Sequence, residues 1–115
     1  MKYHGSCHCG KVAFDVELTI DKALSCNCSI CSRRGSLLSF APRSNLTLLT
    51  PDSELATYTF NKHVIKHRFC KTCGILPFGE STDAKGNAGV AINLRCLENL
   101  DLDAVPILKW DGRSA

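Results

Sequence analysis

Hydrophobic and polar residues alternate most regularly over residues 11–19, KVAFDVELT. Val12, Phe14, Val16 and Leu18 take every second position, and the residues between them are mostly polar. Because successive side chains of a strand point to opposite faces, this pattern predicts a strand with one face buried in the core.

Shorter apolar runs predict further strands. SLLSFA (36–41) and NLTLLT (45–50) are separated by PRS, which favours two strands joined by a turn. GNAGVAINLRCL (86–97) indicates a late strand with Val90 and Cys96 on the same side.

Between these segments, LATYTFN (55–61) and KHVIKHRF (62–69) indicate a hairpin. The period of two would place His63 and His67 on one face of its second strand. This pair is therefore a candidate for proton transfer, and the alternative is that both histidines simply pack.

Evidence for helix is scarce. LENLDLDAV (97–105) is expected to make at most one turn before Pro106, because proline disfavours helical geometry in the residue before it. We therefore expect a single, mostly β domain with little helix over residues 1–115, since a chain of this length fits one compact core.

Composition narrows the class of protein. The chain has 115 residues, eight of them cysteine, and a formal net charge of +3 with neutral histidines. A charge this mild argues against a dedicated nucleic-acid binder. The start, MKYHGSCHCG, has no apolar stretch typical of a secretory signal, and no run is long enough to cross a membrane. We therefore expect a cytoplasmic protein without membrane contact, whose reduced, closely spaced cysteines bind metal.

Two cysteine pairs lie far apart in the sequence. SCHCG presents the sulfurs of Cys7 and Cys9 to one side of an extended chain, and FCKTCG offers Cys70 and Cys73 across a tight turn. These four residues, the outer cysteines, predict a closed tetrahedral zinc site with Zn–S distances near ~2.3 Å that would stabilise a small core. A disulfide, simple burial of the thiols, or iron in place of zinc are the alternatives.

A third motif, SCNCSICSRRG (25–35), holds Cys26, Cys28 and Cys31, which we call the cysteine triplet. Three sulfurs this close in sequence can form a three-sulfur face for a metal ion without a ligand from elsewhere in the chain. If Cys96 completes the set, the site is closed and structural; if it does not, the ion keeps an open position, as catalytic zinc does. Spacing alone does not decide between the two.

The motifs GSCHCGKVAF, CNCSICSRRG, FCKTCG, VAINLRCL and WDGRS follow one another along nearly the whole chain. In this order they resemble the glutathione-dependent formaldehyde-activating enzyme family, which includes centromere-protein-V-like members. The resemblance implies a small zinc-binding β-tent of packed antiparallel sheets with two zinc ions per chain. It assigns a structural zinc to the outer cysteines and an open catalytic zinc to the triplet.

The implied activity is that of a carbon–sulfur lyase that forms or cleaves S-(hydroxymethyl)glutathione from glutathione and formaldehyde. A thiol that binds zinc loses its proton and becomes nucleophilic, which suits this reaction. Arg33 and Arg34 directly follow the triplet, and guanidinium groups pair well with the carboxylates of a small thiol substrate such as glutathione. The alternative for both arginines is a solvated turn.

A different class of function is also compatible with the sequence. A zinc-stabilised module without catalytic activity could bind protein or nucleic acid through the basic edge formed by Lys62, Lys66, Arg68 and Lys71. Such a run of cations is more often a solvated face, and the mild net charge argues against nucleic acid as the partner.

Overall fold

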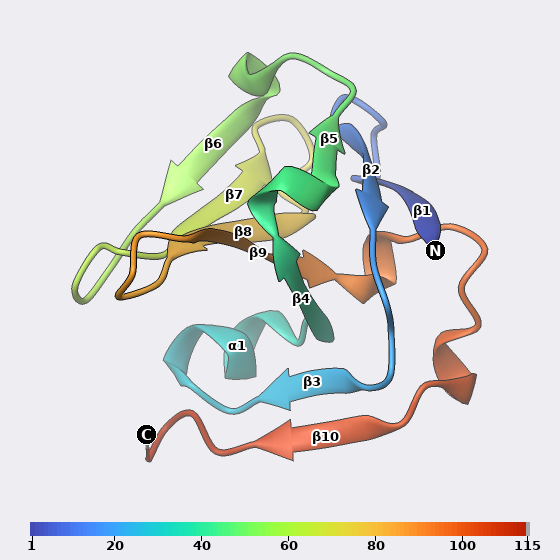
Figure 1. Cartoon of the computed structure of the whole chain (residues 1–115). Helices are drawn as coiled ribbons and strands as arrows, with labels where there is room; N and C mark the ends of the chain where they lie inside the picture. Colours follow the sequence, from blue (N-terminus) through green and yellow to red (C-terminus); the bar gives the residue numbers. More distant parts are fainter. Residues whose placement is uncertain (115) are drawn as a thin grey trace.

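The computed structural model describes residues 1–114 and shows a mostly β protein with one short α-helix (Figure 1). The strands are β1 (Lys2–Ser6), β2 (Ala13–Glu17), β3 (Ala23–Cys26), β4 (Leu38–Pro42), β5 (Leu46–Leu48), β6 (Leu55–Tyr58), β7 (Lys66–Cys70), β8 (Phe78–Thr82), β9 (Ala88–Asn93) and β10 (Ile107–Trp110). Between them lie α1 (Ser29–Arg34) and the short 3-10 turns η1 (Arg43–Asn45), η2 (Asp52–Glu54), η3 (Leu94–Cys96) and η4 (Leu102–Ala104).

The strands form two sheets. The smaller sheet has the order β1-β2-β5, and the larger has the order β10-β3-β4-β9-β8-β7-β6. Paired strands are antiparallel except at one edge of the larger sheet, where β10 runs parallel to β3. Figure 1 shows β3 and β10 side by side at the bottom of the molecule, beneath α1.

The core contains the buried face of β2, as the alternating pattern predicts. Val12, Phe14 and Val16 have no exposed surface, and Leu18 is 3% exposed. The ring of Phe14 meets that of Phe78 on β8 edge to face, with the ring centroids 5.8 Å apart. Because such a contact between large buried rings is favourable, it fixes the smaller sheet against the larger.

The predicted hairpin is present but shorter than expected. β6 and β7 pair antiparallel, and residues 59–65 form the loop between them. His63 lies in this loop with a φ of 57°, exposed to solvent, whereas His67 lies buried on β7. The expectation that the two histidines share a strand face is therefore wrong, because the strand begins only at Lys66.

The late strand also ends earlier than its pattern suggests. Val90, Ile92 and Leu94 are buried as predicted, but β9 ends at Asn93. The Asn93 side chain accepts a hydrogen bond from the backbone N–H of Arg95 and so begins the turn η3. Cys96 consequently lies in that turn and not on the strand.

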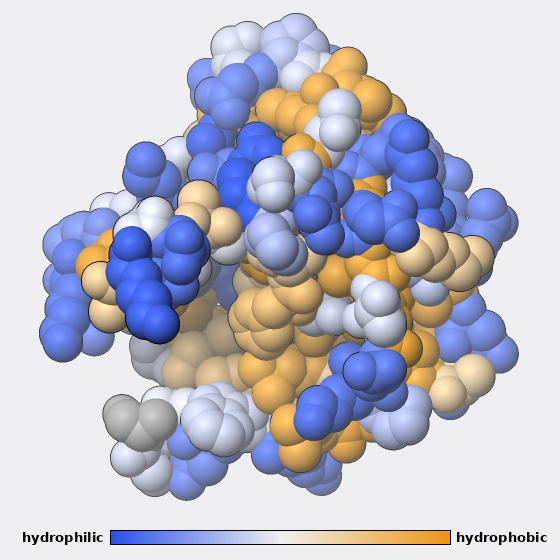
Figure 2. Space-filling model, viewed as in Figure 1, coloured by the Kyte–Doolittle hydropathy of each residue, from blue (hydrophilic) through white to orange (hydrophobic). Residues whose placement is uncertain are grey.

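Apolar side chains also reach the surface. Figure 2 shows an apolar area in the lower part of this face, where β3, β4 and β10 lie. Phe40 on β4 and Ile107 and Leu108 on β10 are among the exposed side chains of these strands. Within residues 1–114, no helix has the length and apolar character needed to cross a bilayer.

Gly5 on β1 supports a testable prediction about this packing. A Cβ at position 5 would lie 2.5 Å from Cζ of Phe14 and 3.0 Å from a methyl group of Leu97. We expect Gly5→Ala to lower the free energy of unfolding by about 1–3 kcal/mol, because the buried ring has nowhere to move. Urea denaturation measures this, and Gly79→Ala is the matched control, since its Cβ would meet only a backbone oxygen at 3.6 Å. Equal midpoints for the two variants would contradict the packing described here.

Candidate metal centres

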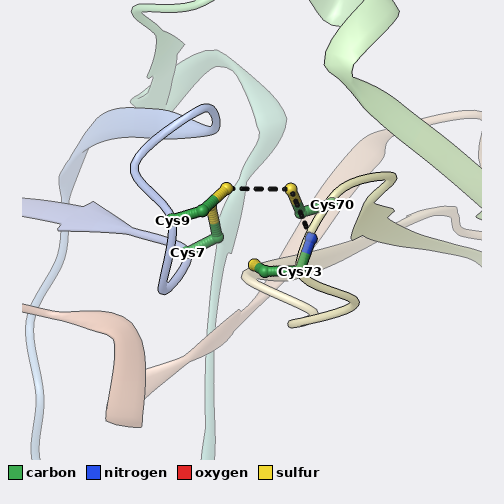
Figure 3. Close-up of side chains that lie close together, drawn as sticks. All are labelled: Cys7, Cys9, Cys70 and Cys73. Carbon is green, nitrogen blue, oxygen red and sulfur yellow. Dashed lines mark hydrogen bonds between the residues drawn. The ribbon is translucent and has the colours of Figure 1, made fainter.

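The outer cysteines come together at one end of the molecule. Cys7 and Cys9 follow β1, Cys70 ends β7, and Cys73 lies in the next turn. Their four sulfurs lie within 4.8 Å of one another and point toward a common centre (Figure 3). The Cys7–Cys9 sulfur distance is 3.7 Å and the Cys9–Cys70 distance is 3.6 Å. A disulfide needs about 2.05 Å, whereas sulfurs around a tetrahedral zinc ion lie about 3.8 Å apart.

Backbone N–H groups surround these sulfurs. Val12 donates to the sulfur of Cys7 at 3.4 Å, and Thr72 and Cys73 donate to that of Cys70 at 3.4 and 3.5 Å. The turn that makes this possible places Gly74 at a φ of 79°, where a residue without a Cβ is least strained. Such donors stabilise thiolate, which is the form that binds metal.

The pKa values follow from these contacts. Desolvation raises the pKa of Cys73, but hydrogen bonds from the backbone N–H groups of Ile75 and Cys9 outweigh it and lower the value to about 6. A backbone N–H donated by Cys73 likewise lowers the pKa of Cys70. The sulfurs of Cys70 and Cys73 are thus prepared for negative charge. The backbone N–H of Lys11 lowers the pKa of Cys9, but desolvation and the neighbouring thiols raise it to about 11. A cation among the four sulfurs would offset their mutual repulsion.

The cysteine triplet forms a second group, whose three sulfurs also lie within 4.8 Å of one another. Cys26 ends β3, Cys28 stands at the N-cap of α1, and Cys31 lies within the helix. The backbone N–H of Cys28 donates to the sulfur of Cys26 at 3.4 Å. Burial, followed by the neighbouring Cys28, raises the pKa of Cys31 to about 12. Three half-buried thiols in one place therefore also favour a bound cation.

Cys96 does not join the triplet. Its sulfur lies 4.0 Å from the carbonyl oxygen of Leu76. Burial, and then the charges of Cys7 and Cys73, raise its pKa to about 11, so its charged neighbours belong to the outer cysteines. Among residues 1–114, no fourth Cys, His, Asp or Glu ligand atom lies within the triplet group. Of the two alternatives left open by the spacing, the structure therefore shows the one in which Cys96 does not complete the triplet group.

The side chains of the two arginines after the triplet make different contacts. Arg34 donates to the sulfur of Cys31 at 3.8 Å, to the hydroxyl of Ser36 at 3.2 Å and to Nδ1 of His67 at 3.3 Å. Arg33 is exposed, and its guanidinium donates to the carbonyl oxygen of Ser29 at 2.7 Å. Arg34 therefore contacts the triplet directly, whereas Arg33 lies on the outer side of the helix.

The buried ring of His67 contacts the guanidinium of Arg34. His67 is 6% exposed, its ring stacks on Phe60 at 5.5 Å, and its Nε2 has no hydrogen-bond partner. Because Arg34 donates to Nδ1, the ring is neutral with its hydrogen on Nε2. Burial, and then the charge of Arg34, lower its pKa. The sequence contains no pattern that would pair these two residues.

A cavity of about 570 Å³ lies beside both groups. It touches the outer cysteines through Cys7, and Arg34 links it to the triplet, although the triplet sulfurs themselves do not line it. Besides Arg34, its polar lining comes from Ser6, His8, Ser36, Asn93, Arg95 and Glu98. Some of these residues lie in the cysteine motifs SCHCG and VAINLRCL, but the sequence does not show that they meet around one cavity.

The basic edge considered for a binding module is reduced in the structure. Arg68 is only 11% exposed at its side chain and pairs with Asp52 at 2.9 Å and with Glu80 at 3.9 Å. Lys62, Lys66 and Lys71 stay exposed. One of the four cations is therefore already neutralised, which weakens this edge as a phosphate-binding surface.

Comparisons with known proteins agree with the geometry. The family model described as glutathione-dependent formaldehyde-activating enzyme matches residues 2–106. A crystal structure of a Rhodobacter sphaeroides protein is similar to this chain, with 35% sequence identity and a TM-score of 0.77. That match covers 94% of this chain and 100% of the other.

Removing metal from the outer cysteines should destabilise the fold. Because the ion would bind the folded chain alone, a strong zinc chelator is expected to lower the free energy of unfolding by about 3 kcal/mol or more. Thermal melting with and without chelator measures this. Cys73→Ala should lose one zinc equivalent, whereas the control Cys96→Ala should keep its metal content. A melting temperature that is unchanged by chelation would contradict the assignment.

Proposed function

The chain belongs to the glutathione-dependent formaldehyde-activating enzyme family, and we propose that it is a zinc-dependent carbon–sulfur lyase acting on adducts of a small thiol and an aldehyde. The observation that supports this most directly is the cysteine triplet, which brings three sulfurs together without a fourth ligand atom among residues 1–114. Three protein ligands with one open position are typical of catalytic zinc sites.

A zinc ion held by the triplet would supply one effect, the loss of the proton from a substrate thiol at neutral pH. The chain supplies the rest. Cys26 ends β3, Cys31 lies within α1 and Cys28 is the N-cap of α1, so two regular elements position the three proposed ligands. Arg34 donates to the Cys31 sulfur and offsets part of the negative charge that gathers when a further thiolate approaches.

The reaction we propose is the addition of the glutathione thiolate to formaldehyde. A carbon–sulfur bond forms, the carbonyl π pair moves to oxygen, and the proton released by the thiol ends on that oxygen. The product is S-(hydroxymethyl)glutathione, and the reverse reaction cleaves the same bond. Atoms and electrons balance without an oxidant or reductant, so no redox cofactor is required.

The cavity beside Arg34 suits the body of such a substrate. Glutathione carries two carboxylates, and Arg34 and Arg95 are the two guanidinium groups that line the cavity. Glu98, also on its wall, could accept a hydrogen bond from the substrate's ammonium group. We propose that Arg34 faces both the substrate and the triplet, whereas Arg33, on the outer side of α1, is the alternative contact.

The outer cysteines would hold a second, structural zinc ion, which brings the total to two per chain. All eight cysteines are free thiols in the structure. Both proposed sites need reduced sulfur, and so does a thiol substrate. We therefore propose that the protein works in a reducing compartment such as the cytoplasm.

A direct test measures how fast formaldehyde and glutathione exchange with their adduct. With ¹³C-labelled formaldehyde, NMR exchange spectroscopy should show faster interconversion when zinc-loaded protein is added. Cys31→Ala should lower the catalysed rate by more than about 100-fold, because a ligand of the open site is lost. The control Ser32→Ala removes only an exposed hydroxyl of the same helix and should keep the rate. An exchange rate unaffected by the wild-type protein would refute this function for glutathione and formaldehyde.

The neighbouring arginines provide a matched pair. Arg34→Gln should raise KM for glutathione by about 10- to 100-fold, because a charge-assisted contact at a partly enclosed site is lost. Arg33→Gln should change KM by no more than about twofold, since its charge is exposed. Steady-state kinetics on both variants show which of the two arginines contacts the substrate. The reverse order of effects would move the substrate to the outer side of α1.

A further inference from the structure

Asn27, between Cys26 and Cys28, is bound to a segment more than eighty residues away. Its backbone N–H donates to the carbonyl oxygen of Trp110 at 3.2 Å. Its side-chain amide donates to the carboxylate of Asp111 at 2.9 Å and accepts from the backbone N–H of Arg113 at 3.0 Å. Both ends of the amide and the backbone N–H of Asn27 therefore bond to segment 110–113.

Gly112, within the same segment, lies against the triplet. A Cβ built at this position would be 2.5 Å from the sulfur of Cys26 and 3.4 Å from Cβ of Cys28. Gly112 does not adopt a positive φ. Glycine is therefore required here for space, so that the backbone can approach the sulfur closely, and not for conformational freedom.

The segment is held in place by an edge strand. β10 pairs only with β3, in parallel register from Ile107 opposite Ala23 to Trp110 opposite Cys26. Figure 1 shows it running below β3, with the chain continuing past the loop that leads into α1. All four residues of β10 are exposed, so this strand adds little to the core. Segment 110–113 belongs to WDGRS, one of the motifs of the family resemblance, but it lies beyond residues 2–106, which the family model matches.

We propose that segment 110–113 is a positioning element for the cysteine triplet, acting through Asn27. The inference rests on the proposal that the triplet binds zinc. With Asn27 fixed on three sides, the backbone between Cys26 and Cys28 has one arrangement, and Gly112 limits where the Cys26 sulfur can move. Segment 110–113 thereby preorganises the sulfurs. Residues that contact the ligands, but not the metal, orient the ligands in the same way at other metal sites.

Exchanging the donor and the acceptor between positions 27 and 111 tests the positioning role. Asn27→Asp places two carboxylates opposite each other and should weaken zinc binding at the triplet by about 10- to 100-fold. The double variant Asn27→Asp with Asp111→Asn places the donor at position 111 and keeps an acceptor at position 27 for the N–H of Arg113. It should recover affinity to within about threefold of the wild type, which a general loss of stability would not do.

Gly112→Ala gives an independent test of the close approach. We expect it to weaken the triplet zinc by a similar factor, because the new methyl group and the Cys26 sulfur cannot both stay in place. The matched control is Gly89→Ala, whose Cβ would meet a backbone oxygen at 3.6 Å. Because segment 110–113 lies outside the buried core, all of these variants are expected to fold, which their melting temperatures will report.

The measurement is a titration of the full chain with zinc against a chromophoric chelator, which resolves two binding phases. Cys31→Ala identifies the phase that belongs to the triplet. If the wild type binds a single ion, the assignment of zinc to the triplet is refuted, and the positioning role is refuted as well. If the wild type binds two ions and Asn27→Asp or Gly112→Ala leaves the triplet phase unchanged, the positioning role is refuted while the zinc site stands.

Discussion

Repulsion among sulfurs is the constraint on which the rest of this structure depends. Residues 61 positions apart bring two sulfurs to 3.6 Å, and two thiolates about 4 Å apart repel by roughly 4 kcal/mol near a protein surface. Backbone N–H donors, a proton shared between two sulfurs, or a bound cation each reduce this repulsion. In a domain this small, whose two sheets meet over a limited core, the free energy of binding such a cation would become part of the free energy of folding.

Arg34 connects the separate parts of the molecule. One guanidinium contacts the triplet through Cys31, the following loop through Ser36, and the larger sheet through the buried His67. It also lines the cavity that reaches the outer cysteines. His67 is neutral and enclosed by an aromatic ring, so it acts as a fixed acceptor that holds this cation in one direction. The geometry of the triplet and the charge of the cavity are therefore coupled through one side chain.

The sequence predicts what is local or strongly periodic. The alternation around Phe14 predicts β2 because one face of that strand is buried, and cysteine spacing predicts both sulfur groups because the ligands of each half-site are near neighbours. It does not predict β3 or β10, whose four-residue runs have no alternation and pair across more than eighty residues. Nor can it separate Arg33 from Arg34, since adjacent helical residues point about 100° apart and only the fold determines which one faces the cavity.

The pairing of β10 with β3 has a consequence for biosynthesis. The outer cysteines are all present once residue 73 has left the ribosome, so these four sulfurs are available to a cation early. The loop containing Asn27 lacks its hydrogen-bond partners until residues 83 to 86 positions later have been made. The triplet therefore gains its neighbours in segment 110–113 only late in synthesis, after the outer cysteines are already available.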